Sequence, residues 1–139
     1  MKTYIVGNWK LNFTVGESSI YLHKLLRALP NYRNIDVIVA PSTIALQPLS
    51  LQVDRHKIKL AAQNGFYRDY GAFTGETSFT QLRGIVDYVI IGHSERRYIF
   101  GEDEKFLQKR WLQLFGIRSR RFSVLARQSQ KGLLGRRRM

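Results

Sequence analysis

The chain has 139 residues, of which 44% are hydrophobic and 24% charged, and it contains no cysteine. This length suits one globular domain with a core and is too short for two ordinary domains. The lack of cysteine excludes a disulfide scaffold and a thiolate metal site. The apolar runs are shorter than the ~18 residues that a membrane-spanning helix needs, and the first residues do not resemble a signal peptide. We therefore expect a cytoplasmic globular protein that does not enter a membrane.

The formal net charge of +13 is unevenly distributed along the chain. Residues 1–105 hold 13 lysines and arginines and all 10 acidic residues, whereas residues 106–139 hold 10 basic residues and no acid. A basic excess can indicate binding to nucleic acid. Here it belongs to the C-terminal tail and not to the body of the domain.

The first hundred residues predict alternating strands and helices. Four short runs are rich in valine and isoleucine and mostly continuous, as in strands buried on both faces of a parallel sheet. They are residues 3–7, 35–40, 58–62 and 88–92. Helical spacing follows at 17–29, 43–51, 78–86 and 103–115, and Ser18 or Ser19 is a possible cap of the first helix. This alternation predicts βαβ units, in a doubly wound sheet or in part of a barrel.

Polar residues follow each predicted strand, at the sheet edge where α/β proteins bind ligands. Asn8 and Lys10 follow the first strand, and a lysine there can hold a phosphate or a developing oxyanion. His93 follows the fourth strand and can act as an acid, a base or a hydrogen-bonding electrophile. If Ser94 and Glu95 open a short helix, its positive end favours a neutral imidazole. The alternatives are a solvated lysine and a histidine satisfied by nearby backbone.

Several common catalytic motifs are absent from the sequence. It has no HExxH metal motif, no phosphate-binding GxxxxGK[ST] loop, no GxGxxG after a strand and no GxSxG nucleophile elbow. These absences disfavour nucleotide hydrolysis, dinucleotide redox chemistry and serine hydrolase chemistry. We expect neither a metal site nor a cofactor.

Four strings in order and at matching spacing identify residues 1 to about 110 as similar to the triosephosphate isomerase family. They are GNWKLN at 7–12, AAQN at 61–64, GAFTGETS at 71–78 and VIIGHSERR at 89–97. The resemblance implies a TIM (β/α)8 barrel that needs no cofactor, usually forms a homodimer and interconverts dihydroxyacetone phosphate and D-glyceraldehyde 3-phosphate in glycolysis and gluconeogenesis. Residues 1–110 would form its N-terminal half, with about four βα units.

The same resemblance implies roles for individual residues. His93 would be the electrophile that polarises the substrate carbonyl, and Lys10 the cation near the phosphate and the enediolate oxygen. Glu95 would be a second carboxylate of the catalytic set, and Asn8 would bind substrate together with Lys10 and His93. The interface loop of the family corresponds to Phe73, Thr74, Gly75 and Glu76.

The resemblance ends near residue 110, although a full barrel takes about 250 residues. The glutamate base of the family follows its sixth strand, and its late phosphate loops follow strands seven and eight. We therefore expect a truncated or frame-shifted chain that is inactive alone, with an irregular basic tail at 111–139. One alternative is nucleic-acid binding by the tail, which thin aromatic content and the lack of a binding motif disfavour. Another is a structural half-barrel that pairs with a full-length subunit through residues 73–76.

Overall fold

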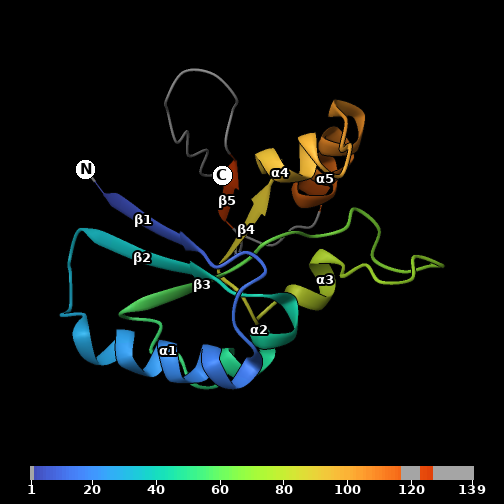
Figure 1. Ribbon diagram of the computed structural model, residues 1–139. Helices are drawn as coiled ribbons and strands as arrows, with labels where there is room; N and C mark the ends of the chain where they lie inside the picture. The colour runs from blue at the N-terminus through green and yellow to red at the C-terminus, as the bar shows by residue number, and fades with distance from the viewer. Residues whose placement is uncertain (1, 117–122, 127–139) are drawn as a thin grey trace. The chain divides into compact units, whose positions relative to one another are not determined.

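The computed structural model describes residues 2–116 and 123–126, which fall into two units. Unit 1 consists of Met1–Gln63 and Ile85–Asp87, and unit 2 of Asn64–Gly84 and Tyr88–Met139. Unit 1 contains β1 (Thr3–Asn8), α1 (Val15–Ala28), β2 (Ile35–Ala40), α2 (Thr43–Ser50) and β3 (Ile58–Ala62). Unit 2 contains α3 (Phe79–Leu82), β4 (Tyr88–Ile91), α4 (Ser94–Tyr98), α5 (Glu104–Gly116) and β5 (Ser123–Ala126) (Figure 1).

The sheet of unit 1 is parallel and keeps the order of the chain. β1 pairs with β2 from Thr3 opposite Ile35 to Asn8 opposite Ala40, and β2 pairs with β3. Helices α1 and α2 lie along one face of these strands (Figure 1). The last four residues of β2 and most of β3 are buried, as expected for continuous apolar strands. The register places the polar residues after β1 beside the carboxyl end of β2.

The first helix begins with a capping box at Thr14, not at the predicted Ser18 or Ser19. The Thr14 hydroxyl accepts a hydrogen bond from the Glu17 backbone N–H at 3.3 Å, and the Glu17 carboxylate accepts one from the Thr14 N–H at 2.8 Å. The Thr14 hydroxyl also donates to this carboxylate at 2.8 Å, and the two donors, the backbone N–H first, lower the pKa of Glu17. Ser18 instead lies fully buried inside the helix. The T-x-x-E pattern is a local signature of this cap.

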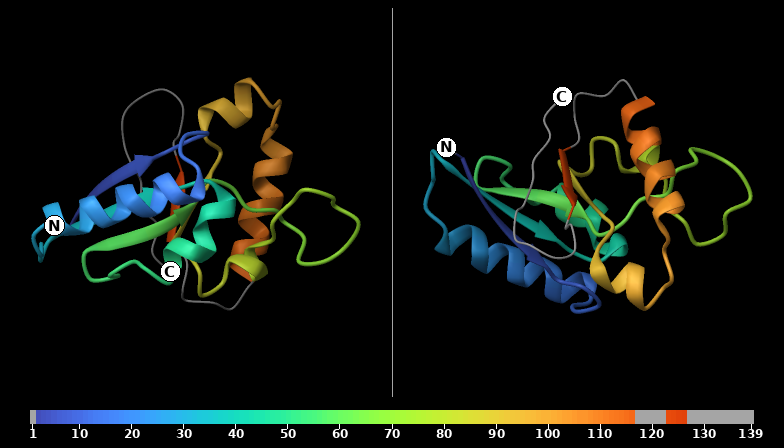
Figure 2. Two further views of the ribbon diagram at one scale, coloured as in Figure 1. Left: turned by 60° about the horizontal axis from the view of Figure 1, so that its bottom comes forward. Right: turned by 90° about the horizontal axis from the view of Figure 1, so that it is seen from above.

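Unit 2 combines a parallel strand pair with three helices. β4 pairs with β5 from Tyr88 opposite Ser123 to Ile91 opposite Ala126. The segment before α3 forms a long loop that stands out in both views of Figure 2. The helix predicted at 78–86 is shorter than expected, because Arg83 is extended and Gly84 takes a left-handed φ of 81°. A left-handed residue cannot continue a right-handed helix.

Part of the tail predicted as irregular has regular structure. α5 continues through Gly116, and β5 covers Ser123–Ala126. The short apolar run of β5 pairs with β4 through backbone hydrogen bonds. The prediction of an irregular tail rested on charge and did not take this run into account. The rest of that expectation concerns residues 117–122 and 127–139, which lie outside the described residues.

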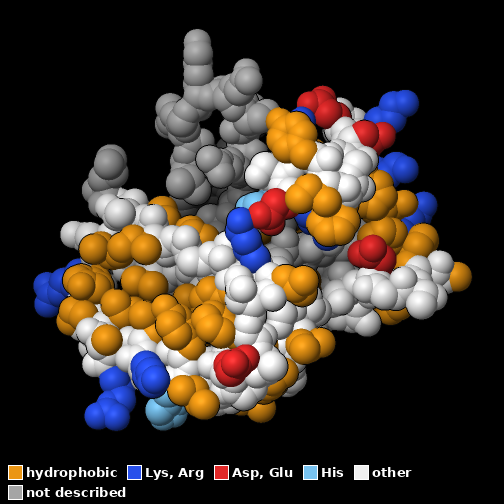
Figure 3. All heavy atoms as spheres, in the orientation of Figure 1, with side chains coloured by type: hydrophobic (Ala, Val, Ile, Leu, Met, Phe, Trp, Pro, Cys, Tyr) orange, Lys and Arg blue, Asp and Glu red, His pale blue; other side chains and the backbone are white. Residues whose placement is uncertain are grey.

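The strands of unit 1 differ in how well they are covered. β1 alternates between exposed and half-buried residues, and Ile5 is 53% exposed. Figure 3 shows apolar side chains in view over the strands of this unit. Among the described helices, none is both long enough and apolar enough to cross a membrane. Parallel strands that alternate with helices confirm the predicted fold class, the N-terminal half of a (β/α)8 barrel.

Candidate active site

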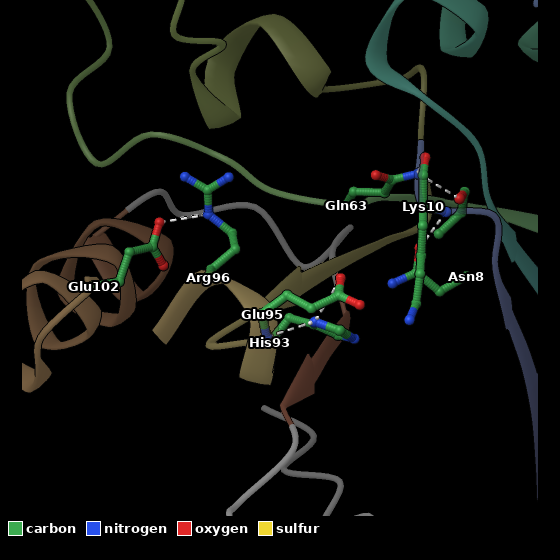
Figure 4. Close-up of polar contacts among 8 residues, drawn as sticks. Asn8, Lys10, Gln63, His93, Glu95, Arg96 and Glu102 are labelled. Atoms are coloured by element: carbon green, nitrogen blue, oxygen red, sulfur yellow. Dashed lines mark hydrogen bonds and ion pairs between the residues drawn. The ribbon is translucent and has the colours of Figure 1, made fainter. Parts of the chain in front are cut away.

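The first group of candidate residues lies in the turn after β1, in unit 1. Asn8 ends the strand, and its side-chain oxygen accepts a hydrogen bond from the Lys10 backbone N–H at 3.0 Å (Figure 4). Lys10 has a φ of 55°, in the left-handed region that residues with a Cβ rarely adopt. Such a conformation costs about 1–3 kcal/mol and persists only where neighbouring groups hold it. The sequence therefore places both residues correctly, and the structure adds that the Lys10 backbone is strained.

A cluster of three aromatic rings, those of Trp9, Phe13 and Tyr21, packs beside the same turn. Trp9 is 7% exposed, and its ring forms T-shaped contacts with the rings of Phe13 and Tyr21 at centroid distances of 5.3 Å. The Asn12 side-chain amide donates a hydrogen bond to the Trp9 carbonyl oxygen at 2.7 Å. Trp9 is thus a packing residue. Because the Trp9 side chain is packed, the backbone that leads into the exposed Lys10 is held in place.

The second group lies at the start of α4, in unit 2. His93 is the N-cap of this helix, and its Nδ1 accepts a hydrogen bond from the Glu95 backbone N–H at 3.2 Å. A neutral imidazole carries one N–H, so an Nδ1 that accepts leaves the proton on Nε2. The short helix that we expected Ser94 and Glu95 to open is present as α4 (Ser94–Tyr98). It presents His93 as a hydrogen-bond donor through Nε2, which is what an electrophile for a carbonyl oxygen requires.

Glu95 lies in the first turn of α4, beside the same imidazole nitrogen. Its Oε2 is 3.5 Å from His93 Nδ1, and its side chain is 38% exposed (Figure 4). Because Nδ1 already accepts from the backbone, this approach is an ion pair only when the imidazole is protonated. A neutral imidazole with a lone pair on Nδ1 fits the hydrogen bond from the Glu95 N–H better than an imidazolium does. Glu95 therefore borders His93 on the side away from the Nε2 proton.

A buried ion cluster connects α4 to α5 within unit 2. The Arg110 guanidinium is fully buried and donates to both oxygens of Glu102 at 2.7 and 2.8 Å, and Arg96 donates to the same carboxylate. Burial acts to raise the pKa of Glu102, but the hydrogen bonds and charges of Arg110 and Arg96 outweigh it, so that the pKa is lowered. Arg96 lies in α4, whose N-cap is His93, and this cluster therefore attaches α4 to α5.

The predicted interface loop forms a tight turn in unit 2. The Glu76 N–H donates to the Phe73 carbonyl oxygen at 3.1 Å, and Gly75 has a φ of 88°, which a type II turn requires at this position. Phe73 is 40% exposed, while its ring also lies 4.7 Å from that of Phe66. Thr74 and Glu76 are exposed as well. A backbone hydrogen bond thus fixes the turn of this loop, and its residues are exposed. Its role as an interface stays a prediction.

The structure groups the candidate residues by unit. It brings Asn8 together with Lys10, and His93 together with Glu95. Within residues 2–116 and 123–126 there is no group of three or more histidines, aspartates and glutamates arranged to hold a metal ion.

Sequence reasoning gave no role to Gln63, whose side-chain amide donates to the Lys10 carbonyl oxygen at 2.9 Å. It also gave none to Arg110. Two signals were available for Gln63: its place directly after the third strand and its inclusion in the string AAQN at 61–64.

Comparison with known proteins identifies the family of the chain. A family model described as triosephosphate isomerase matches residues 3–117. Triosephosphate isomerase of Dehalococcoides mccartyi is 44% identical over 98 residues, which cover 70% of this chain and 39% of that protein. Those of Pelobacter propionicus and Clostridium novyi are each 42% identical, covering 76% and 82% of this chain and 43% and 46% of the relatives. The chain thus spans less than half the length of these relatives. Over the part that it shares with them, it belongs to the triosephosphate isomerase family.

Proposed function

We propose that these residues form the electrophile and cation part of a triosephosphate isomerase active site, which interconverts dihydroxyacetone phosphate and D-glyceraldehyde 3-phosphate. The observation that carries the proposal is the hydrogen bond from the Glu95 N–H to His93 Nδ1. It leaves the Nε2 proton to be donated to the substrate carbonyl oxygen. Lys10 supplies positive charge for the phosphate and for the oxyanion that develops, and Asn8 holds the turn that carries Lys10.

The reaction also needs a base to move a proton between the two carbons of the substrate. The acidic residue nearest to the C-terminus of these 139 residues is Glu104, in the first turn of α5. The family base follows a later strand, so no residue of this chain takes that place. We therefore propose that these 139 residues alone have no turnover and supply only the electrophile and cation part of the site.

A complementation assay tests this proposal. The full chain is assayed alone and after mixing with the C-terminal segment of the Dehalococcoides mccartyi relative that lies beyond the shared part. We expect no isomerisation from either piece and measurable isomerisation from the mixture. His93→Gln should lower the rate of the mixture by about 10²–10³, as for the loss of one oxyanion donor. His23→Gln, a change of histidine on α1 of unit 1, is the matched control and should leave the rate unchanged. Turnover by the chain alone at the rate of the relative would contradict the proposal, as would indifference to His93→Gln.

We further propose a cytoplasmic protein that uses residues 73–76 to contact a second subunit. Support comes from the exposed Phe73 ring and from the fixed turn that follows it. Sedimentation of the chain with Phe73→Ser, compared with the unaltered chain, tests the contact. We expect the variant to lower the mass of the species present at a given concentration. An unchanged mass distribution would rule out this loop as the contact. The alternative of nucleic-acid binding rests on a tail that lies mostly outside the described residues, and we do not propose it.

A further inference from the structure

The Lys10 turn is hydrogen-bonded to a residue that follows a different strand, β3. The backbone N–H of Lys10 is bonded to the Asn8 side chain, two residues away. Its carbonyl oxygen is bonded to the side-chain amide of Gln63, which is 53 residues away in the sequence. Asn8 acts from the same turn, so a local contact satisfies one end of the Lys10 backbone. The contact with Gln63 attaches that backbone to a residue that follows β3 in the same unit.

A single nitrogen of Gln63 bridges two carbonyl groups. Nε2 donates to the Lys10 oxygen and to the Ala40 oxygen, each at 2.9 Å (Figure 4). The Ala40 oxygen also accepts from the Trp9 backbone N–H at 3.0 Å. A primary amide has two N–H groups, so both of these hydrogen bonds can form at once. The carboxyl ends of β1, β2 and β3 are thereby connected through one side chain.

We propose that Gln63 is a positioning residue that holds the backbone of Lys10 in its left-handed conformation and so sets the direction of the ammonium group. The proposal rests on the proposed function only for the use that is made of Lys10. A residue with a Cβ favours right-handed φ values, so the observed φ of 55° needs external support. Rotation of the Lys10 backbone out of this region would redirect the Cα–Cβ bond and move the ammonium away from a bound phosphate.

The expected size of the effect follows from the hydrogen bonds that Gln63 makes. Two neutral hydrogen bonds of ordinary net strength support the turn. Gln63→Glu keeps the shape of the side chain but removes both donors and sets a carboxylate against two carbonyl oxygens. We expect the ratio of left-handed to other conformations at Lys10 to fall by about tenfold, which corresponds to about 1.4 kcal/mol.

Nuclear magnetic resonance of the full, isotope-labelled chain tests the proposal directly. In the unaltered chain, scalar couplings through the hydrogen bonds should connect Gln63 Nε2 with the carbonyl carbons of Lys10 and Ala40. A strong nuclear Overhauser effect between the amide and Hα protons of Lys10 should report the left-handed φ, because these two protons lie close together there. This effect should weaken in Gln63→Glu.

Gln52 provides a matched control in the same unit. Its Nε2 also donates to two oxygens, those of the Ser19 hydroxyl at 3.0 Å and the Pro48 carbonyl at 3.1 Å. Gln52→Glu should leave the Lys10 signals unchanged. If Gln63→Glu does not fold, Gln63→Met removes the donors without adding a charge. Missing couplings in the unaltered chain, or an unchanged Lys10 signal in a folded Gln63 variant, would overturn the proposal.

These measurements do not depend on catalysis, so the two proposals can fail separately. Suppose that Gln63→Glu shifts the Lys10 signals but the unaltered chain, mixed with the complementary segment, shows no turnover. Then the positioning role stands and the proposed function fails. If the complemented chain is active and Gln63→Glu leaves both the Lys10 signals and the rate unchanged, the proposed function stands and the positioning role fails.

Discussion

Removal of the Glu102 carboxylate should destabilise unit 2 far more than removal of an exposed acid. Arg110 is fully buried, and its two hydrogen bonds to Glu102 are the contacts that compensate its charge. The Glu102 side chain is itself only 6% exposed. Glu102→Ala leaves the guanidinium buried without a counter-charge, which typically costs about 3–5 kcal/mol. We expect a loss of that size in the free energy of unfolding.

Glu104→Ala is the matched control for this prediction. Its side chain is 83% exposed and lies 3.8 Å from Arg97, so its loss should cost less than about 1 kcal/mol. The double variant Glu102→Leu with Arg110→Leu removes both charges together. It should be much less damaging than Glu102→Ala, because replacement of a buried pair by apolar residues is often neutral or stabilising.

Urea unfolding, followed by circular dichroism and by tryptophan fluorescence, measures these differences. Equal losses for Glu102→Ala and Glu104→Ala would refute the argument that a buried uncompensated charge dominates. A double variant as unstable as the single one would show that shape, and not charge, determines the loss.

Three further predictions concern the same units. The pKa of Glu102 is lowered in the folded chain, so the stabilisation by this carboxylate should be fully present above its ordinary pKa of 4.5 and should disappear as the pH falls through the lower pKa of the folded state. The difference in urea midpoint between the unaltered chain and Glu102→Gln should therefore vanish in acid. A difference that stays constant with pH would contradict this. Gly65→Ala should destabilise by about 1–3 kcal/mol, since a Cβ there would lie 2.2 Å from the buried ring of Phe79; thermal unfolding measures it, and an unchanged midpoint would count against the packing. Thr14→Ala should cost about 0.5–2 kcal/mol through the loss of the cap with Glu17, seen as reduced helicity and a lower midpoint; no change would mean that the cap contributes nothing.

The sequence predicted β1 to β4 but not β5, because a run of apolar residues is a local signal and β5 lies in a tail dominated by charge. The short, mostly apolar runs IDVIVA and IKLAA predicted β2 and β3 with the bounds that the structure has. The helix boundaries were less certain, because a cap depends on one or two hydrogen bonds. Thr14 was missed although its pattern with Glu17 is local, whereas the end of α3 depends on the left-handed Gly84.

The candidate residues were also found from the sequence, because the carboxyl ends of parallel strands are where polar side chains gather. Asn8 ends β1, Lys10 lies two residues after it, and His93 lies two residues after the end of β4. Their states were not predictable in the same way. The left-handed φ of Lys10 does not appear in any periodicity, and the His93 proton position depends on the N–H that its Nδ1 faces.

By itself, the sequence determined the alternation of strands and helices, the place of the polar residues at strand ends and the family to which residues 3–117 belong. Only the tertiary structure decided that Gln63 supports Lys10 and that Arg110 is buried against Glu102. The physical reason is distance along the chain and loss of water. A pattern records which residues are apolar and how they are spaced, whereas a hydrogen bond across 53 residues, or the burial of a charge, exists only once the chain has folded.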